Sequence, residues 1–229
     1  LKVEMAGACG TDYKIYDGRV AMAPLPIIMG HEILGHVAKI GGRAARRWGV
    51  KEGDRVVVEG SVGCMMCDNC RDGNYRFCVE SKGYGVRRSS ADAPHLWGAF
   101  AQYMYLAPGS LIHKVSDRLS PEAGCMITAV ISNGVYWARW LGKVKIGDTV
   151  LIQGVGQQGL SCVVGAKESG ATTIIVTGLS RDAQRMQIAK RLGADFTIDV
   201  QKENLTERVL EITAGKLPDV VLDVSGNPE

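Results

Sequence analysis

The chain has 229 residues, of which 46% are hydrophobic and 22% charged, an ordinary globular composition with room for one large or two ordinary domains. Its net charge of +3 is interspersed along the sequence, so charge gives no case for nucleic acid or an anionic membrane as partner. The sequence contains no apolar run near the roughly 20 residues that a membrane-spanning helix needs.

The cysteine content and the two ends bear on the compartment and on completeness. Seven cysteines, an odd number that includes a metal-like cluster, argue for a reducing, cytoplasmic interior and against a disulfide framework. The sequence opens at Leu1 with a strand in progress and stops at Glu229 soon after an apolar strand. We therefore expect this sequence to be an internal piece of a longer protein and to lack both ends of that protein.

Residues 1–119 alternate short apolar segments with turns, which predicts a β-rich domain with inserted loops. The strands expected there cover residues 1–5, 56–59 and 100–106. The turns expected there are Gly41-Gly42, residues 51–54 and Pro108-Gly109.

Two short motifs in this part carry candidate metal ligands, Cys9-Gly10-Thr11-Asp12 and Gly30-His31-Glu32. Each is weak evidence alone. Ahead of a cysteine lobe and a dinucleotide-binding pattern they become specific. A Cys thiolate and a neutral His are ligands of catalytic zinc when one coordination position stays open. Such an ion would act as a Lewis acid on an alcohol or carbonyl oxygen.

Residues 60–80, approximately, contain a second candidate metal site, formed by four cysteines. The spacing is Cys-x2-Cys-x2-Cys-x7-Cys, with the cysteines at Cys64, Cys67, Cys70 and Cys78. Four thiolates can surround one Zn²⁺ tetrahedrally and leave no position for substrate, so we interpret this lobe as a structural zinc site. A bacterial iron–sulfur run has a shorter last gap and a Pro after the final Cys, where this chain has Val79. Four unmetallated thiols are the remaining alternative.

Residues 120–229 have a different character. Ser120-Pro121 is a helix-start signal, and we expect a long apolar helix from there to about Leu141. Beyond it, strands and helices alternate. The expected strands are residues 149–153, 174–177, 196–198 and 220–224, and the expected helices are residues 157–169, 182–192 and one opening at Asn204. This alternation predicts an α/β, doubly wound parallel sheet, truncated after four of the six strands of the dinucleotide-binding form.

A glycine-rich turn joins the first of these strands to its helix. It reads Gly154-Val155-Gly156-Gln157-Gln158-Gly159, the G-x-G-x-x-G pattern in the strand–turn–helix context that makes it strong evidence. The glycines allow a tight turn, approach of the backbone to a pyrophosphate, and close packing of helix on strand. A merely structural glycine turn is the alternative.

The end of the second strand bears on the choice between NAD and NADP. An acidic residue there would bind the ribose 2′-hydroxyl, but the sequence has Gly178-Leu179-Ser180-Arg181. The missing carboxylate, with Arg181 and nearby Arg185, favours a 2′-phosphate and hence NADP. The alternative is that these charges are solvated residues of a helix start.

With these motifs in place, the chain resembles the zinc-dependent medium-chain alcohol dehydrogenases over essentially its whole length. The resemblance implies a GroES-like catalytic domain, residues 1–119, and a truncated NAD(P)-binding Rossmann domain, residues 120–229, with the active site between them. It also implies roles for individual residues. These are catalytic-zinc ligands at Cys9 and His31, an acidic residue beside or on the metal at Glu32, a proton acceptor at Thr11, a carboxylate orienting the ligand histidine at Asp12, and a structural zinc on Cys64, Cys67, Cys70 and Cys78.

Two positions depart from the family pattern. The third protein ligand of catalytic zinc falls at Ala129, which cannot bind metal, so we hypothesise that Glu32 completes the site; weak or absent zinc is the alternative. The histidine that often relays the proton to solvent is replaced by Lys14. Either the relay runs through Thr11 and the cofactor ribose, or Lys14 serves in a different way.

The function expected from this resemblance is hydride transfer between an alcohol or polyol, or its carbonyl, and NAD(P). The expected partners are a small-molecule alcohol or carbonyl substrate and a second copy of the chain, as a dimer or tetramer. Two alternatives remain: a zinc-free NADPH-dependent alkene or quinone reductase on the same scaffold, and a non-enzymatic nucleotide-binding protein.

Overall fold

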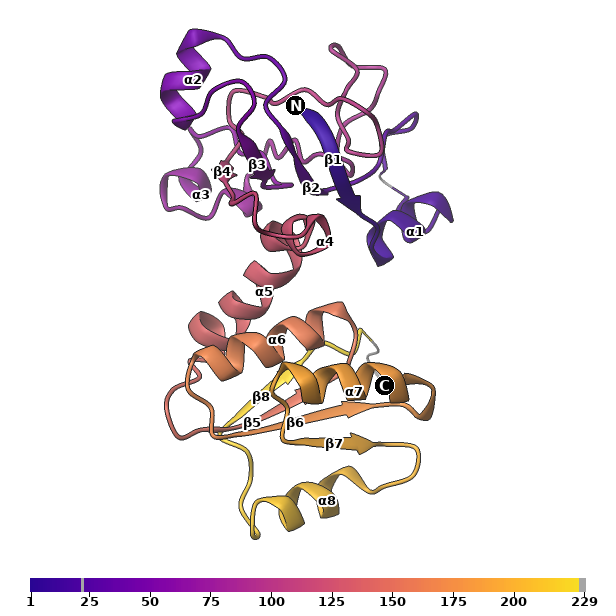
Figure 1. Cartoon of the computed structure of the whole chain (residues 1–229). Coiled ribbons are helices and arrows are strands. Elements are labelled where there is room, and N and C mark those ends of the chain that lie inside the picture. Colours follow the sequence, from indigo (N-terminus) through magenta and orange to yellow (C-terminus); the bar gives the residue numbers. More distant parts are fainter. Residues whose placement is uncertain (22, 227–229) are drawn as a thin grey trace. The chain divides into compact units, whose positions relative to one another are not determined.

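The computed structural model describes residues 1–21 and 23–226 (Figure 1). The chain separates into two units, Leu1–Ala129 and Val130–Glu229, within the helical segment that follows Ser120. Among the described residues, no helix combines the length and the apolar character that a membrane crossing requires.

The first unit is built on a four-stranded antiparallel sheet in the order β1-β2-β3-β4. The strands are β1 (Lys2–Gly7), β2 (Glu32–His36), β3 (Arg55–Val58) and β4 (Ile112–Lys114). Successive side chains of a strand point to opposite faces, and here both faces are covered. Ile33 packs in a core cluster with Tyr84 and Trp97, whereas Leu34 packs with Val57 and Cys125 on the other face.

Short helices and loops surround this sheet. The helices are α1 (Gly10–Tyr16), α2 (Gly42–Trp48), α3 (Asp68–Arg71), the 3₁₀ turn η1 (Tyr75–Phe77) and α4 (Pro121–Cys125). The expected N-cap of the last of these is confirmed, because the Ser120 side chain accepts a hydrogen bond from the Ala123 N–H at 3.3 Å.

Two local predictions are wrong. Gly41-Gly42 does not form a simple turn: Gly41 is the N-cap of α2, which runs through two alanines and ends at a left-handed Gly49. Residues 100–106 form no strand, and Tyr103 makes only an isolated bridge with Lys2. The backbone there bonds in turn to Leu1 and to Leu96, so no single strand lies beside it for long enough to form a ladder.

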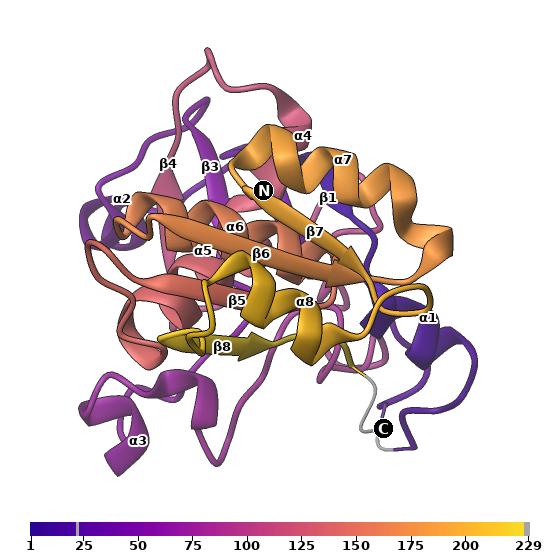
Figure 2. The same ribbon diagram turned by 90° about the horizontal axis from the view of Figure 1, so that it is seen from below.

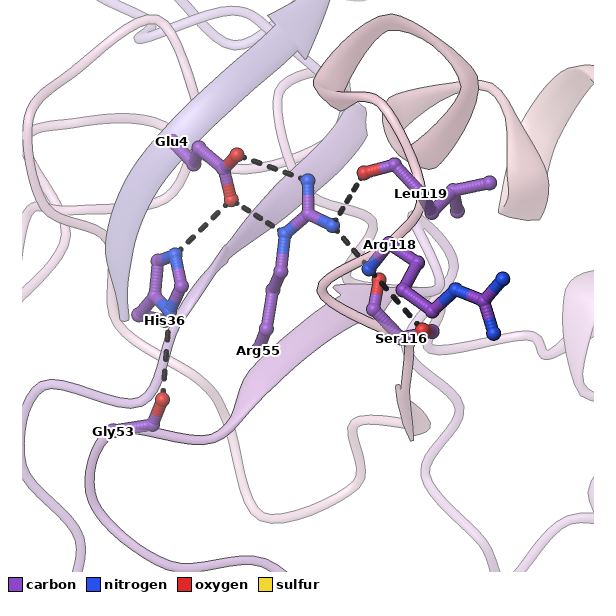
Figure 3. A network of polar contacts seen from close by, with 7 residues as sticks. All are labelled: Glu4, His36, Gly53, Arg55, Ser116, Arg118 and Leu119. Atoms are coloured by element: carbon purple, nitrogen blue, oxygen red, sulfur yellow. Dashed lines mark hydrogen bonds and ion pairs between the residues drawn. The ribbon is translucent and has the colours of Figure 1, made fainter.

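A buried arginine joins the sheet to the segment that leads into α4 (Figure 3). The Arg55 guanidinium donates to both carboxylate oxygens of Glu4, at 2.8 and 2.9 Å. It also donates to the carbonyls of Ser116 and Leu119, at 2.9 and 2.7 Å. The His36 ring contacts the same carboxylate at 3.1 Å. These bonds satisfy a cation that is only 6% exposed, and they fix the path of the chain out of the sheet.

The second unit contains the predicted parallel sheet, in the order β7-β6-β5-β8 (Figure 2). Its strands are β5 (Thr149–Gln153), β6 (Thr173–Gly178), β7 (Phe196–Asp199) and β8 (Val220–Asp223). Numbered from β5, this is the order 3-2-1-4, which is the first part of the dinucleotide-binding topology. The expected α/β fold class and all four expected strands are confirmed.

Helices cover both faces of this sheet (Figure 1). They are α6 (Gln157–Glu168), α7 (Ala183–Leu192), which follows the 3₁₀ turn η4 (Ser180–Asp182), and α8 (Leu205–Ile212). Val163 of α6 and Met186 of α7 share a core with Ile152. Val209 of α8 packs with Ile175 in a separate cluster, which identifies the opposite face. Because successive side chains of a strand point to opposite faces, the apolar strands supply side chains to the cores on both faces of the sheet.

The predicted long apolar helix is a series of helical turns rather than one uniform α-helix. After α4 come the π-helical η2 (Ile127–Ile131), α5 (Ser132–Val135) and the π-helical η3 (Tyr136–Leu141). Within the second unit, α5 and α6 approach through their backbones. A Cβ atom added to Gly134 would lie 2.3 Å from the Ser161 carbonyl carbon, and one added to Gly165 would lie 2.5 Å from the Gly134 oxygen.

The Glu4 network generates a stability prediction. Replacement of Glu4 by Gln leaves Arg55 without its anionic partner, and we expect a loss of about 1–3 kcal/mol in the free energy of unfolding at pH 7, measured by urea denaturation. The Arg55 hydrogen bonds hold the pKa of Glu4 below its ordinary value of 4.5. This stabilisation is complete above pH 4.5, the ordinary pKa of glutamate, and it is lost as the pH falls from there through the lowered pKa of Glu4 in the folded protein.

The difference between wild type and Glu4→Gln should therefore shrink below pH 4.5. Glu80→Gln, at an exposed glutamate, is the matched control and should leave stability unchanged at every pH. A difference for Glu4→Gln that stays constant across the acid range would contradict the ion-pair explanation.

Candidate functional site

The first cluster of chemical groups forms where β1 and β2 meet. β1 ends at Gly7, which is paired with Glu32 at the start of β2. Cys9 follows two residues later as the N-cap of α1, so the antiparallel register brings it beside His31. Two motifs that are distant in sequence therefore meet because of strand pairing.

The cluster contains a sulfur, a nitrogen and an oxygen donor. The Cys9 Sγ lies 3.1 Å from the His31 Nε2, and one donor atom each from Cys9, His31 and Glu32 lie within 4.8 Å of one another. Glu32 is only 3% exposed. A buried carboxylate beside a thiol and an imidazole is a donor set that fits zinc with three protein ligands and an open fourth position.

Asp12 holds this cluster in shape. Its carboxylate accepts the N–H of Cys9 at 2.9 Å and that of Gly30 at 3.3 Å. Its Oδ1 also lies 3.4 Å from the His31 Nδ1, a close approach without hydrogen-bond alignment, and that buried nitrogen has no hydrogen-bond partner among the described residues. The Nε2 thus faces Cys9 while the Nδ1 faces a carboxylate, as in metal-binding histidines oriented by an acid.

The charges of the cluster support one another. Burial opposes the charged form of each group, but contacts with Asp12 and Cys9 outweigh it and raise the pKa of His31 to about 10. Burial likewise opposes the Cys9 thiolate, yet His31 and the Thr11 N–H, which donates to Sγ at 3.3 Å, lower the pKa of Cys9. A zinc ion at this point would require the thiolate form of Cys9 and the neutral form of His31, because metal ligands must be deprotonated.

Ala129 and Cys125 do not contribute a ligand. Ala129 has no donor atom in its side chain. Cys125 is buried against Leu34, and its thiol donates to the Glu122 carbonyl at 3.3 Å. Glu32 is therefore the third donor that the structure brings to Cys9 and His31 among the described residues. The role of Glu32 as a ligand stays a prediction.

The two predicted proton-transfer residues differ in position. Thr11 is half-buried in the first turn of α1, and its hydroxyl is one of the groups that lower the pKa of Cys9. Lys14 lies in the same helix with its side chain exposed. The fold thus sets the Thr11 hydroxyl beside the cluster, whereas it directs Lys14 to solvent.

The four cysteines of the lobe converge as a second group. Donor atoms of Cys64, Cys67, Cys70 and Cys78 all lie within 4.8 Å of one another. The Sγ atoms of Cys64 and Cys70 are 4.0 Å apart, and those of Cys67 and Cys78 are 3.9 Å apart. Tetrahedral zinc with four sulfurs separates them by about 3.8 Å. N–H groups of Met66 and Cys67 donate to the Cys64 sulfur and lower the pKa of that thiol to about 7. The lobe therefore fits a closed zinc site.

The glycine-rich turn lies in the second unit, between β5 and α6. Gly154 has φ of 100°, which favours glycine. A Cβ on Gly159 would lie 1.9 Å from the Gly154 oxygen, whereas a Cβ on Gly156 would meet nothing within 4 Å. The third glycine packs helix on strand, and the second leaves its surroundings open. With the half-buried Gln158 and the exposed Gln157 in the first turn of a 12-residue helix, this cradle fits a pyrophosphate.

The end of β6 contains a group that the sequence interpretation missed. Gly178, at the end of β6, is buried. In η4, Ser180 is half-buried and Arg181 is exposed. The Ser180 hydroxyl donates to the Asp199 carboxylate at 2.7 Å. Asp199 is the last residue of β7, the parallel strand next to β6. Its acidic side chain at a strand end was the sequence signal that could have identified it.

Comparison with known proteins identifies two matching families. Residues 1–117 match the alcohol dehydrogenase GroES-like domain, and residues 158–229 match the zinc-binding dehydrogenase domain. A probable alcohol dehydrogenase of Mycobacterium tuberculosis is 41% identical over 98% of this chain and 61% of its own length. D-arabitol-phosphate dehydrogenase of Enterococcus avium is 36% identical over 99% of this chain and 60% of its own length.

The fold has a close counterpart among solved structures. An alcohol dehydrogenase of Thermotoga maritima superposes with a TM-score of 0.86 at 31% sequence identity, covering 97% of this chain and 62% of its own. The chain thus spans about three fifths of the length of the relatives it matches.

The lobe gives a prediction about metal content. We expect the protein to bind about two equivalents of zinc, and Cys67→Ser to retain roughly one, because three thiolates no longer close the tetrahedron. Zinc is measured by elemental analysis of the dialysed protein. Cys162→Ala removes a buried thiol of the other unit and should keep both equivalents. Equal zinc in Cys67→Ser and wild type would contradict the lobe as a zinc site.

The turn gives a prediction about nucleotide binding. Gly156 has φ of −68° and open space around its Cα, so Gly156→Val should fold normally. Its side chain would occupy the space of a pyrophosphate, and we expect affinity for NADH to fall at least about 100-fold, measured by fluorescence titration. Unchanged affinity in the valine variant would show that the turn is only structural.

Proposed function

Because the chain belongs to the zinc-dependent medium-chain alcohol dehydrogenase family, we propose that the protein containing it transfers a hydride reversibly between an alcohol or polyol, or the corresponding carbonyl, and NAD(P). The observation that carries the proposal is the convergence of Cys9, His31 and Glu32 on one point beside a carboxylate that orients the histidine.

The residues of the first unit divide the work. Cys9, His31 and Glu32 would hold a catalytic zinc, and Asp12 would keep the imidazole turned toward it. When bound, zinc and nicotinamide supply Lewis-acid polarisation of the substrate oxygen and acceptance of the hydride. The Thr11 hydroxyl oxygen would take the proton from the alcohol, which its position next to Cys9 supports. Lys14 remains a candidate for passing that proton to solvent.

The second unit and the cysteine lobe supply binding and support. The turn Gly154–Gly159 would hold the pyrophosphate through N–H groups at the start of α6. A closed structural zinc on the four lobe cysteines would fix a loop whose own helices are each only about one turn long.

The setting of the protein follows from the same proposal. A reducing, cytoplasmic compartment suits seven cysteines that form no disulfide with one another. The substrate would be a small alcohol or carbonyl compound, and association into dimers or tetramers is part of the proposal. Light scattering of the purified protein measures that association directly.

Glu32 provides the sharpest test. In the zinc-loaded protein, we expect Glu32→Ala to lose about one zinc equivalent and at least about 100-fold in turnover on its best alcohol or polyol, because two ligands are too few for a stable site. Zinc content and the reduction of NAD⁺ and NADP⁺ are measured across a panel of alcohols and polyols. Glu122→Ala, at an exposed glutamate of the same unit, is the control and should change neither quantity.

Two outcomes would contradict the proposal. Glu32→Ala with full zinc and full turnover would remove Glu32 from the metal site. Reduction of activated alkenes or quinones with NADPH by a protein without catalytic zinc would replace the function itself.

A further inference from the structure

The carboxyl end of β6 lacks an acid of its own, but the neighbouring strand supplies one. Gly178, the last residue of β6, stands where an acidic residue would receive a ribose 2′-hydroxyl. In the parallel ladder, the residue in register with Gly178 is Asp199, the last residue of β7. Figure 2 shows the two strands side by side with their carboxyl ends at the same edge.

Asp199 and Gln201 fasten the loop that follows β6. The Ser180 hydroxyl donates to Asp199 Oδ2 at 2.7 Å, and the Ser180 N–H donates to the Gln201 side-chain oxygen at 3.0 Å. The Gln201 N–H donates to Asp199 Oδ1 at 3.1 Å. The Asp199 side chain is 12% exposed and also contacts the Lys202 ammonium at 3.2 Å, which is itself 71% exposed. The carboxylate is therefore fixed in position on the strand beside Gly178, where the acid is missing.

We propose that Asp199, acting with Ser180, makes this nucleotide site select an unmodified ribose 2′-hydroxyl, and hence NAD⁺ rather than NADP⁺. The inference rests on the proposed function, because it concerns the cofactor of that reaction. The Ser180 hydroxyl has one proton, and it is donated to Asp199, so Ser180 has none left for a 2′-phosphate. The Asp199 charge would repel that phosphate, whereas a ribose hydroxyl can donate to Asp199 or to the Ser180 oxygen.

The nearby arginines do not offset this carboxylate. Arg185 is paired with Asp182 at 3.2 Å, and Arg181 is exposed on η4. A solvated guanidinium contributes little until it is drawn into a desolvated contact. This inference opposes the NADP preference that the sequence suggests, and the two can be separated by measurement.

The test compares NADH with NADPH, which differ in the 2′-phosphate, by fluorescence titration without substrate. We expect wild type to bind NADH more tightly. Asp199→Asn removes the charge and keeps one acceptor oxygen, for the bond from either the Ser180 hydroxyl or the Gln201 N–H, and it should tighten NADPH binding about tenfold relative to NADH. Asp195→Asn makes the same charge change before the first residue of β7, where Asp195 accepts the Ile174 N–H at 2.8 Å, and should leave the ratio unchanged.

A second variant tests the same carboxylate in the opposite direction. Lys202→Ala removes an exposed cation from Asp199, so it should fold normally and weaken NADPH binding relative to NADH by about threefold. Thermal melts of each variant check folding.

The outcomes separate the inference from the function it rests on. Tighter binding of NADPH by wild type, or an unchanged ratio in Asp199→Asn, would overturn the role of Asp199 and favour a 2′-phosphate site at Arg181. Absence of binding for both nucleotides would overturn the inference together with the proposed cofactor chemistry.

Discussion

The buried carboxylate of Asp12 is the constraint on which the first unit's chemistry depends. It accepts the N–H groups of Cys9 and Gly30 and faces the ring of His31, so it joins the start of α1 to the entry of β2. A bare sulfur and imidazole side by side would be free to rotate. Because Asp12 contacts both residues, their donor atoms stay directed toward the same point. Carboxylates that hydrogen-bond to metal ligands orient those ligands in the same way.

The second unit reaches its chemistry by a different route. In the proposed function no side chain would need to be aimed at a pyrophosphate, because the backbone N–H groups at the start of α6 would provide the donors. Steric contacts decide which glycines the fold requires. A Cβ atom on Gly159 would clash with the Gly154 oxygen, whereas one on Gly156 would meet no atom nearby. The parallel register adds a further group, since it sets Asp199 beside Gly178 from another strand.

Much of this arrangement could be predicted from the sequence, and the failures have a common cause. Signals confined to a few residues predicted the Ser120 cap and the apolar strands after residue 148 correctly, and the cysteines of the Cys64–Cys78 spacing do converge, although zinc there stays a prediction. Residues 100–106 misled because their alternating pattern lacked a continuous partner strand. Asp199 was missed because its position depends on pairing between strands about twenty residues apart, which no local pattern records. The candidate ligand Glu32 could be identified from the sequence because it follows His31 directly.

The contact between α5 and α6 has a consequence for attempts to stabilise the protein. Exchanging glycine for alanine inside a helix ordinarily gains up to about 1 kcal/mol. At Gly134 and Gly165 the added methyl group would penetrate the facing backbone, so the two helices would have to separate. That separation would shift α6, whose first turn bears the dinucleotide motif. Consensus or computational redesign aimed at heat tolerance should therefore leave both positions untouched, even though each looks like an easy gain.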